Sequence, residues 1–169
     1  MAKHFKGGDI INEGKKFEED FKKSVPEGAY FLRIKDSAMS WGQGENIRFT
    51  PKNPYDAILF ANNTLFVLEL KSINGTSLPF DNIKNQQIQE LLLASKCPGV
   101  KAGLIINFRK SETTYFFPIE DFNAFMLVTD KKSINKKDLQ FMYAIEIQAH
   151  KKRTRSRYDI AGFIEQVTA

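Results

Sequence analysis

Residues that bind soft metals or form disulfides are nearly absent from this sequence. Cysteine occurs once in 169 residues, as Cys97, so the chain has no internal disulfide and no C-x-x-C pair for zinc. Histidine occurs only as His4 and His150, and the two do not form an H-x-x-x-H pair. Any hydrolytic chemistry must therefore depend on carboxylates, lysine and a metal ion.

Long apolar runs are missing too. No stretch approaches the roughly 18 uninterrupted apolar residues of a membrane span, and the opening MAKHFKGG lacks the apolar core of a signal peptide. We therefore expect a cytoplasmic protein without a membrane partner. Apolar residues make up 42% and charged residues 27%, a balance typical of a folded chain. We expect one domain over residues 1–169, with residues 1–10 flexible.

Hydrophobic periodicity predicts helices alternating with strands. Phe17, Phe21 and Val25 form one apolar stripe, which predicts a helix over residues 14–25 that Pro26 ends. A second helix is predicted over residues 81–96, with Asp81 as its cap, and a short one over 119–127. Strands are predicted over residues 29–34, 56–60, 65–71, 102–108 and 113–119, the last at an edge. Residues 141–148 fit either a strand or a helix.

The predicted order implies an α/β fold, a mixed sheet flanked by helices. The strands at 56–60 and 65–71 are separated by Asn62, Asn63 and Thr64, which have the spacing and composition of a hairpin turn. Residues 37–53 are rich in Gly, Ser, Asn and Pro, and their apolar residues follow neither the period of a helix nor that of a strand. This composition predicts a long loop or hairpin.

Three charged residues carry the chemical interest of the sequence. Asp56 opens one strand of the predicted hairpin, and Glu69 and Lys71 lie two apart on the other, so these two share a face of the sheet. Antiparallel pairing would bring Asp56 beside them. The pattern predicts two carboxylates and one amine at the same end of the sheet.

An E-x-K pair is most often an exposed ion pair worth under about 1 kcal/mol. Glu69, however, follows four apolar residues in a strand predicted to be central, where a carboxylate is costly to desolvate without a cation. Paired hard oxygen ligands, with no histidine or thiol near, favour Mg²⁺ or Mn²⁺. This placement favours a metal site over a surface ion pair.

The same residues resemble a known signature. P-Y-D at 54–56 and E-L-K at 69–71 look like the PD-(D/E)-x-K pattern of restriction-endonuclease-like nucleases. A resemblance to the RecU family of Holliday junction resolvases extends over most of the chain. The residues that carry it are Asn12, Gly14, Glu18, S-L-P at 77–79, Asn82, Gln87, Ile88 and R-Y-D at 157–159.

The resemblance implies a restriction-endonuclease-like fold and specific roles. Asp56, Glu69 and Gln87 would bind the metal, and Lys71 would orient the attacking water and stabilise the transition state. Glu18 would face this cluster from the first helix as a further catalytic residue. Where the RecU family has a hydroxyl residue, an arginine and a histidine, this chain departs from it, with Pro54, Glu13 and Lys84.

The chain is basic, with a net charge of +5 and an isoelectric point near 9.2, which is compatible with a polyanionic partner. The run HKKRTRSRYD fits either a solvated loop or a surface that follows phosphates, and the segments KKSINKK and IRFTPKN favour DNA. The candidate DNA-binding residues are Arg48, Lys52, Lys84, Lys151, Lys152, Arg153, Arg155 and Arg157.

The resemblance implies cleavage of branched DNA, a four-way junction, by symmetric nicking. A junction has near two-fold symmetry, so two like cuts call for two active sites on a homodimer. Residues 37–53 would then correspond to the stalk that RecU-like proteins insert into the junction centre. Two alternatives stay open: a nuclease of the same fold acting on flaps, ends or duplex, and a DNA-binding module that lost the reaction.

Overall fold

The structure is a computed structural model that describes residues 12–34 and 53–169. Within these residues six strands form a mixed sheet in the order β1-β2-β3-β5-β6-β8, and two strand pairs, β4 with β7 and β9 with β10, lie outside it. The strands are β1 (Tyr30–Arg33), β2 (Ala57–Ala61), β3 (Thr64–Ile73), β4 (Ser77–Pro79), β5 (Val100–Phe108), β6 (Thr113–Pro118), β7 (Ser133–Asn135), β8 (Ile145–Glu146), β9 (Ala149–Lys152) and β10 (Arg155–Tyr158). The helices are α1 (Glu13–Lys22), η1 (Phe80–Asn82), α2 (Asn85–Ser95), α3 (Ile119–Val128), α4 (Lys136–Phe141) and α5 (Ile160–Thr168).

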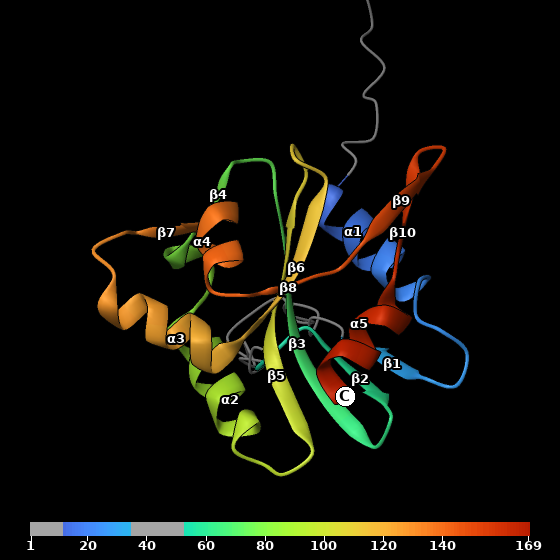
Figure 1. Ribbon diagram of the computed structural model, residues 1–169, viewed down its shortest axis with the longest axis horizontal. Coiled ribbons are helices and arrows are strands. Elements are labelled where there is room, and N and C mark those ends of the chain that lie inside the picture. Colours follow the sequence, from blue (N-terminus) through green and yellow to red (C-terminus); the bar gives the residue numbers. More distant parts are fainter. Residues whose placement is uncertain (1–11, 35–52) are drawn as a thin grey trace, which may run out of the picture.

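Helices cover both faces of the sheet, as the α/β prediction requires. Figure 1 shows α2, α3 and α4 on one side of the strands and α1 and α5 on the other. Among the described residues, no helix is long and apolar enough to cross a membrane.

The predicted hairpin is confirmed at β2 and β3, which pair antiparallel from Ala57 opposite Leu68 to Ala61 opposite Thr64. Asn62 and Asn63 make the turn with φ of 49° and 56°. Asparagine tolerates this left-handed conformation, which matches the turn to the twist of the two strands. The turn therefore fixes the register that places Asp56 relative to the following strand.

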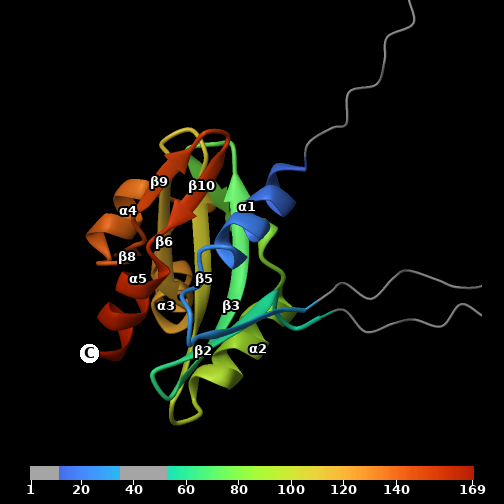
Figure 2. The ribbon, with the colours of Figure 1, turned by 90° about the vertical axis from the view of Figure 1, so that its right-hand side faces the viewer.

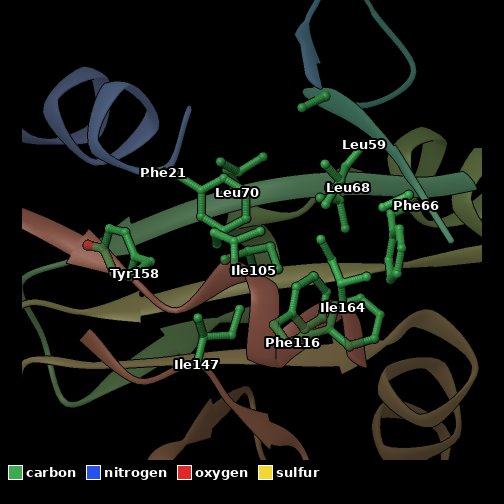
Figure 3. Close-up of a cluster of buried hydrophobic side chains, with 14 of the residues drawn as sticks. Phe21, Leu59, Phe66, Leu68, Leu70, Ile105, Phe116, Ile147, Tyr158 and Ile164 are labelled. Carbon is green, nitrogen blue, oxygen red and sulfur yellow. The ribbon is translucent and has the colours of Figure 1, made fainter. Parts of the chain in front are cut away.

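Strand β3 lies in the interior of the sheet, between β2 and the parallel strand β5. Its side chains alternate between two separate cores, which explains the uninterrupted apolar run from Leu65 to Leu68. Leu68 and Leu70 belong to the core under α1 and α5, whereas Val67 belongs to the core under α2, α3 and α4. Figure 3 shows part of the first core, where Leu70 lies near Phe21 of α1.

Three expectations about local structure are wrong. Helix α2 starts at Asn85 with Lys84 as its cap, because Asp81 lies in the preceding 3-10 turn and Ile83 is buried between the two. Strand β6 is not an edge strand, since Ile145 and Glu146 of β8 pair with it. The solvated-loop interpretation of the basic run is wrong, because the run forms the β9–β10 hairpin.

Residues 141–148, for which the sequence fits either a helix or a strand, contain the last residue of α4 and then the short strand β8. The predicted first helix is present but ends at Lys22, before Val25 and Pro26. Asn12 caps its start, because its side-chain oxygen accepts a hydrogen bond from the Lys15 amide at 3.2 Å. The predicted stalk at 37–53 lies almost wholly outside the described residues, as do Arg48, Lys52 and residues 1–10.

Gly103 is required by the close approach of β5 to β6. A Cβ at this position would lie 2.5 Å from the Phe117 carbonyl oxygen and 2.7 Å from the Phe116 ring. Overpacking of this kind typically costs about 1–3 kcal/mol, so we expect Gly103→Ala to lower the free energy of unfolding by that amount in urea titrations. At Gly75 the nearest atom would be 3.6 Å away, so Gly75→Ala is the matched control and should stay within about 1 kcal/mol of wild type. Equal losses in both variants would contradict this account.

Candidate active site

Asp56, Glu69 and Lys71 come together as the sequence predicts. Continuing the register of β2 and β3 by one step sets Asp56 opposite Glu69. One oxygen of Asp56, Oδ2, accepts a hydrogen bond from the Leu70 amide at 2.9 Å. This bond holds the Asp56 carboxylate against β3, beside the side chain of Glu69.

Glu69 is buried, with only 1% of its surface exposed. Its Oε1 is 2.7 Å from Nζ of Lys71 and accepts a hydrogen bond from Nε2 of Gln87 at 2.6 Å. Its other oxygen, Oε2, is buried and has no hydrogen-bond partner among the described residues. A buried carboxylate oxygen without a donor is unfavourable unless a cation or another ligand meets it.

Burial and the neighbouring charge of Asp56 raise the pKa of Glu69 from its ordinary value of 4.5 to about 7, although Lys71 acts in the opposite direction. Two carboxylates placed together in a site of low polarity resist ionising together. The pair therefore favours binding of a positive charge, either a proton or a cation.

Gln87 reaches this cluster from the first turn of α2. Its Oε1 accepts a hydrogen bond from the Lys84 amide at 3.1 Å, while its Nε2 donates to Glu69. The side chain thus caps its own helix and positions Glu69 with the same amide group. Lys84 is exposed at the start of the same helix, on the approach to the cluster.

Glu18 is joined to the cluster through Arg33, a residue that the sequence reasoning missed. Nε of Arg33 donates to Oε2 of Glu18 at 2.7 Å, and Nη1 donates to the Asp56 carbonyl at 3.0 Å. Nη2 of Arg33 lies 3.6 Å from Oδ1 of Asp56. Glu18 therefore reaches Asp56 through a guanidinium instead of lining the cluster directly, and its predicted catalytic role stays a prediction.

The sequence does hold a signal for Arg33, because it is the one charged residue in the apolar run AYFLRI. The sequence of this run does not show which strand pairs with it. Only the alignment of Arg33 with Ala57 brings the guanidinium next to Asp56.

The β9–β10 hairpin packs against α1, and Figure 2 shows the two side by side. Arg155 donates to the buried Asp20 at 2.6 Å and to Glu19 at 2.8 Å, and the Ser156 amide donates to Asp20 at 3.0 Å. Arg155 thus fastens the hairpin to the helix.

The other residues of this run differ in their surroundings. Lys151 forms an ion pair with Glu112, and Nη1 of Arg157 donates to the Ser156 carbonyl at 3.1 Å. Lys152 and Arg153 are exposed at the end of the hairpin. The structure does not bring these residues to the Asp56–Glu69 cluster, and DNA binding by them stays a prediction.

The donor set fits a hard divalent cation. Asp56 and Glu69 offer carboxylate oxygens, one of them buried without a partner, and Gln87 offers an amide. In residues 12–34 and 53–169 no third carboxylate, histidine or cysteine joins them as a metal cluster. The remaining ligands of a metal ion would have to be neutral groups, water or the substrate.

The sequence model for Recombination protein U, RecU, matches residues 40–157. The chain belongs to the RecU family. The SPbeta prophage-derived uncharacterized protein YotM of Bacillus subtilis (strain 168) is 30% identical to it over 168 residues, which cover 92% of this chain and 85% of YotM.

The fold is also similar to a solved structure, Hjc of Archaeoglobus fulgidus, a Holliday junction resolvase from an archaeal hyperthermophile. The match has a TM-score of 0.51 and 19% sequence identity, and covers 79% of this chain and 95% of Hjc. The predicted restriction-endonuclease-like fold is confirmed. Together, family and fold make the chain a junction-cleaving endonuclease.

The raised pKa of Glu69 predicts a pH dependence of stability in metal-free buffer. The folded protein holds its proton more tightly than the unfolded chain, so stability should fall as the pH rises from 4.5 to about 7. Glu69→Gln keeps the shape and removes this titration. In EDTA we expect the variant to be more stable than wild type at pH 8, by on the order of 1–3 kcal/mol, and the gain to shrink toward pH 5. Denaturant titrations at both pH values test this, and a gain that does not depend on pH would refute it.

Proposed function

We propose that the chain is a divalent-metal-dependent endonuclease that resolves four-way DNA junctions by symmetric nicking. The observation that carries the proposal is the buried Oε2 of Glu69, beside Asp56 and Lys71, for which residues 12–34 and 53–169 supply no hydrogen-bond partner. A surface ion pair would leave the carboxylate and the amine in water, whereas the carboxylate of Glu69 is buried and would be stabilised by a bound cation. Membership of the RecU family supports the junction as the substrate.

We assign Asp56 and Glu69 as the residues that would hold Mg²⁺ or Mn²⁺, with Gln87 as a further ligand or as the group that positions Glu69. When bound, such a cation lowers the pKa of water and neutralises charge that gathers on the scissile phosphate. Leu70 contributes through its amide, which fixes the Asp56 carboxylate. Arg33 restrains the same residue from the other side.

We assign Lys71 the role of orienting the attacking water and stabilising the transition state. Its amine is held 2.7 Å from Oε1 of Glu69, and 21% of its side chain is exposed. It is therefore fixed at the carboxylate and still open to a phosphate. A positive charge placed in advance in a partly buried site stabilises developing negative charge more than a mobile surface lysine does.

Symmetric cutting would need two such sites, and we propose a homodimer in which each chain supplies one. We further propose that residues 37–53, which directly precede the strand that Asp56 introduces, contact the centre of the junction. The substrate class is tested by incubating the protein with a four-way junction, a flap, a blunt duplex and single-stranded DNA, each with Mg²⁺ or Mn²⁺. Paired nicks in like strands of the junction support resolution, and equal cleavage of flap or duplex would favour a general nuclease.

Asp56→Asn should abolish cleavage while junction binding persists or tightens, because the change removes a negative charge and no phosphate contact. Cleavage assays with Mn²⁺ and binding assays in EDTA measure the two effects separately. Asp130→Asn, at an exposed position outside the cluster, is the matched control and should cut like wild type. An Asp56→Asn variant that cuts at the wild-type rate would rule out the proposed metal site.

Lys71→Ala should lower turnover on the order of 10²-fold or more, with little change in affinity, as expected for a group that acts in the transition state. Lys84→Ala offers a contrast, because Lys84 is exposed beside the cluster and should affect affinity alone. Single-turnover rates at saturating junction give the comparison. Unchanged turnover with weakened binding would reduce Lys71 to a phosphate contact.

A further inference from the structure

A groove of about 620 Å³ opens where the loop after β3, the turn between β5 and β6, and the start of α4 meet. It lies apart from Asp56 and Glu69, neither of which lines it. Figure 1 shows β4, β7 and α4 gathered on one side of the sheet. Each of these elements supplies residues that line the groove. Its charged lining residues are Lys110, Lys136 and Lys137.

The charge of this groove has a single sign. None of the residues that line it is acidic, and within the described part of the chain its three lysines form no ion pair. The carboxylate of the nearby Asp138 interacts with other groups: it forms an ion pair with Lys131 and accepts a hydrogen bond from the Asn135 amide at 3.1 Å. Among the residues that the structure describes, no acidic side chain therefore forms an ion pair with the groove lysines.

Short hydroxyl side chains also line the groove, at Thr76, Ser77, Ser111 and Ser133, and its other polar side chains are the amides of Asn135 and Gln140. Hydroxyl donors beside lysines are common ligands of phosphate oxygens, and they carry no information about base sequence. The lysines and hydroxyl groups give the groove the chemistry of a site that positions a phosphate backbone.

The distance from the groove to the cluster is shorter than one turn of a DNA duplex. Strand β3 leads from Lys71 to its end at Ile73, which is aligned with the groove residue Phe108, and a bend then leads to the groove residue Gly75. Four residues span at most about 13 Å even when fully extended, well below the roughly 34 Å of one duplex turn. A duplex arm with a phosphate at Lys71 can therefore reach the groove within the same turn.

We propose that this groove binds the backbone phosphates of one duplex arm of the substrate and so sets the orientation of that arm relative to the active site. The proposal rests on the proposed function for the identity of the substrate. It also gives a role to the segment KKSINKK, in which Lys131 is neutralised by Asp138, whereas Lys136 and Lys137 face the groove.

The test compares two triple variants of equal charge. Lys110→Ala, Lys136→Ala and Lys137→Ala remove the groove lysines, whereas Lys22→Ala, Lys96→Ala and Lys101→Ala remove exposed lysines elsewhere. Binding of a labelled duplex and of a labelled four-way junction is measured in EDTA over a range of salt concentrations. Each phosphate contact contributes about 0.9 to the slope of log K against log salt, so the groove variant should lose about 2 to 3 units of slope. The control variant should keep the wild-type slope.

If the triple variant does not fold, the three groove lysines are replaced one at a time. Each single substitution should lower the slope of log K against log salt by about 1. A groove variant with the wild-type slope, in a protein that binds and cuts junctions, would overturn the groove alone. A wild type that binds neither DNA would instead overturn the proposed function.

Discussion

The buried carboxylate of Glu69 is the constraint around which the rest of the site is arranged. A charge in the interior of a sheet is strongly unfavourable, and a strand between two cores has no water to solvate it. Lys71 and Gln87 offset part of this cost at one oxygen, and the other oxygen is left without a donor. The neighbouring Asp56 increases the cost instead of relieving it. Such an arrangement stabilises the folded protein less than an apolar residue would, and this supports the proposed cation site over a structural ion pair.

Much of this site could be predicted from the sequence, because its main parts are local. Asp56, Glu69 and Lys71 belong to one hairpin, and the period of a strand together with the turn at Asn62 and Asn63 fixes how they meet. Fold class followed from the same alternation of helices and strands. Gln87 was found by family resemblance alone, since nothing in the spacing of a helix shows which strand its first turn faces.

The parts that could not be predicted depend on pairings between distant segments. Arg33 meets Asp56 only because β1 pairs with β2, and nothing in either strand specifies that partner. Arg155, a predicted DNA contact, is held by the buried Asp20, 135 residues earlier in the chain, and nothing in the sequence indicates that partner. Its contact with DNA stays a prediction. Strand β6 looked like an edge because a partner of two residues, β8, is too short to leave a periodic signal.

The two carboxylates are held by different layers of the molecule. Asp56 is restrained by Arg33, which is bound to Glu18 on α1, on the face that also carries the β9–β10 hairpin. Glu69 is restrained by Gln87 on α2, on the opposite face. The distance between the carboxylates, which decides whether one cation can be shared, therefore depends on how both layers pack against β3. Glu18 and Asp20 belong to the same helix, so the contact of Arg155 with Asp20 fastens the helix that also carries the partner of Arg33.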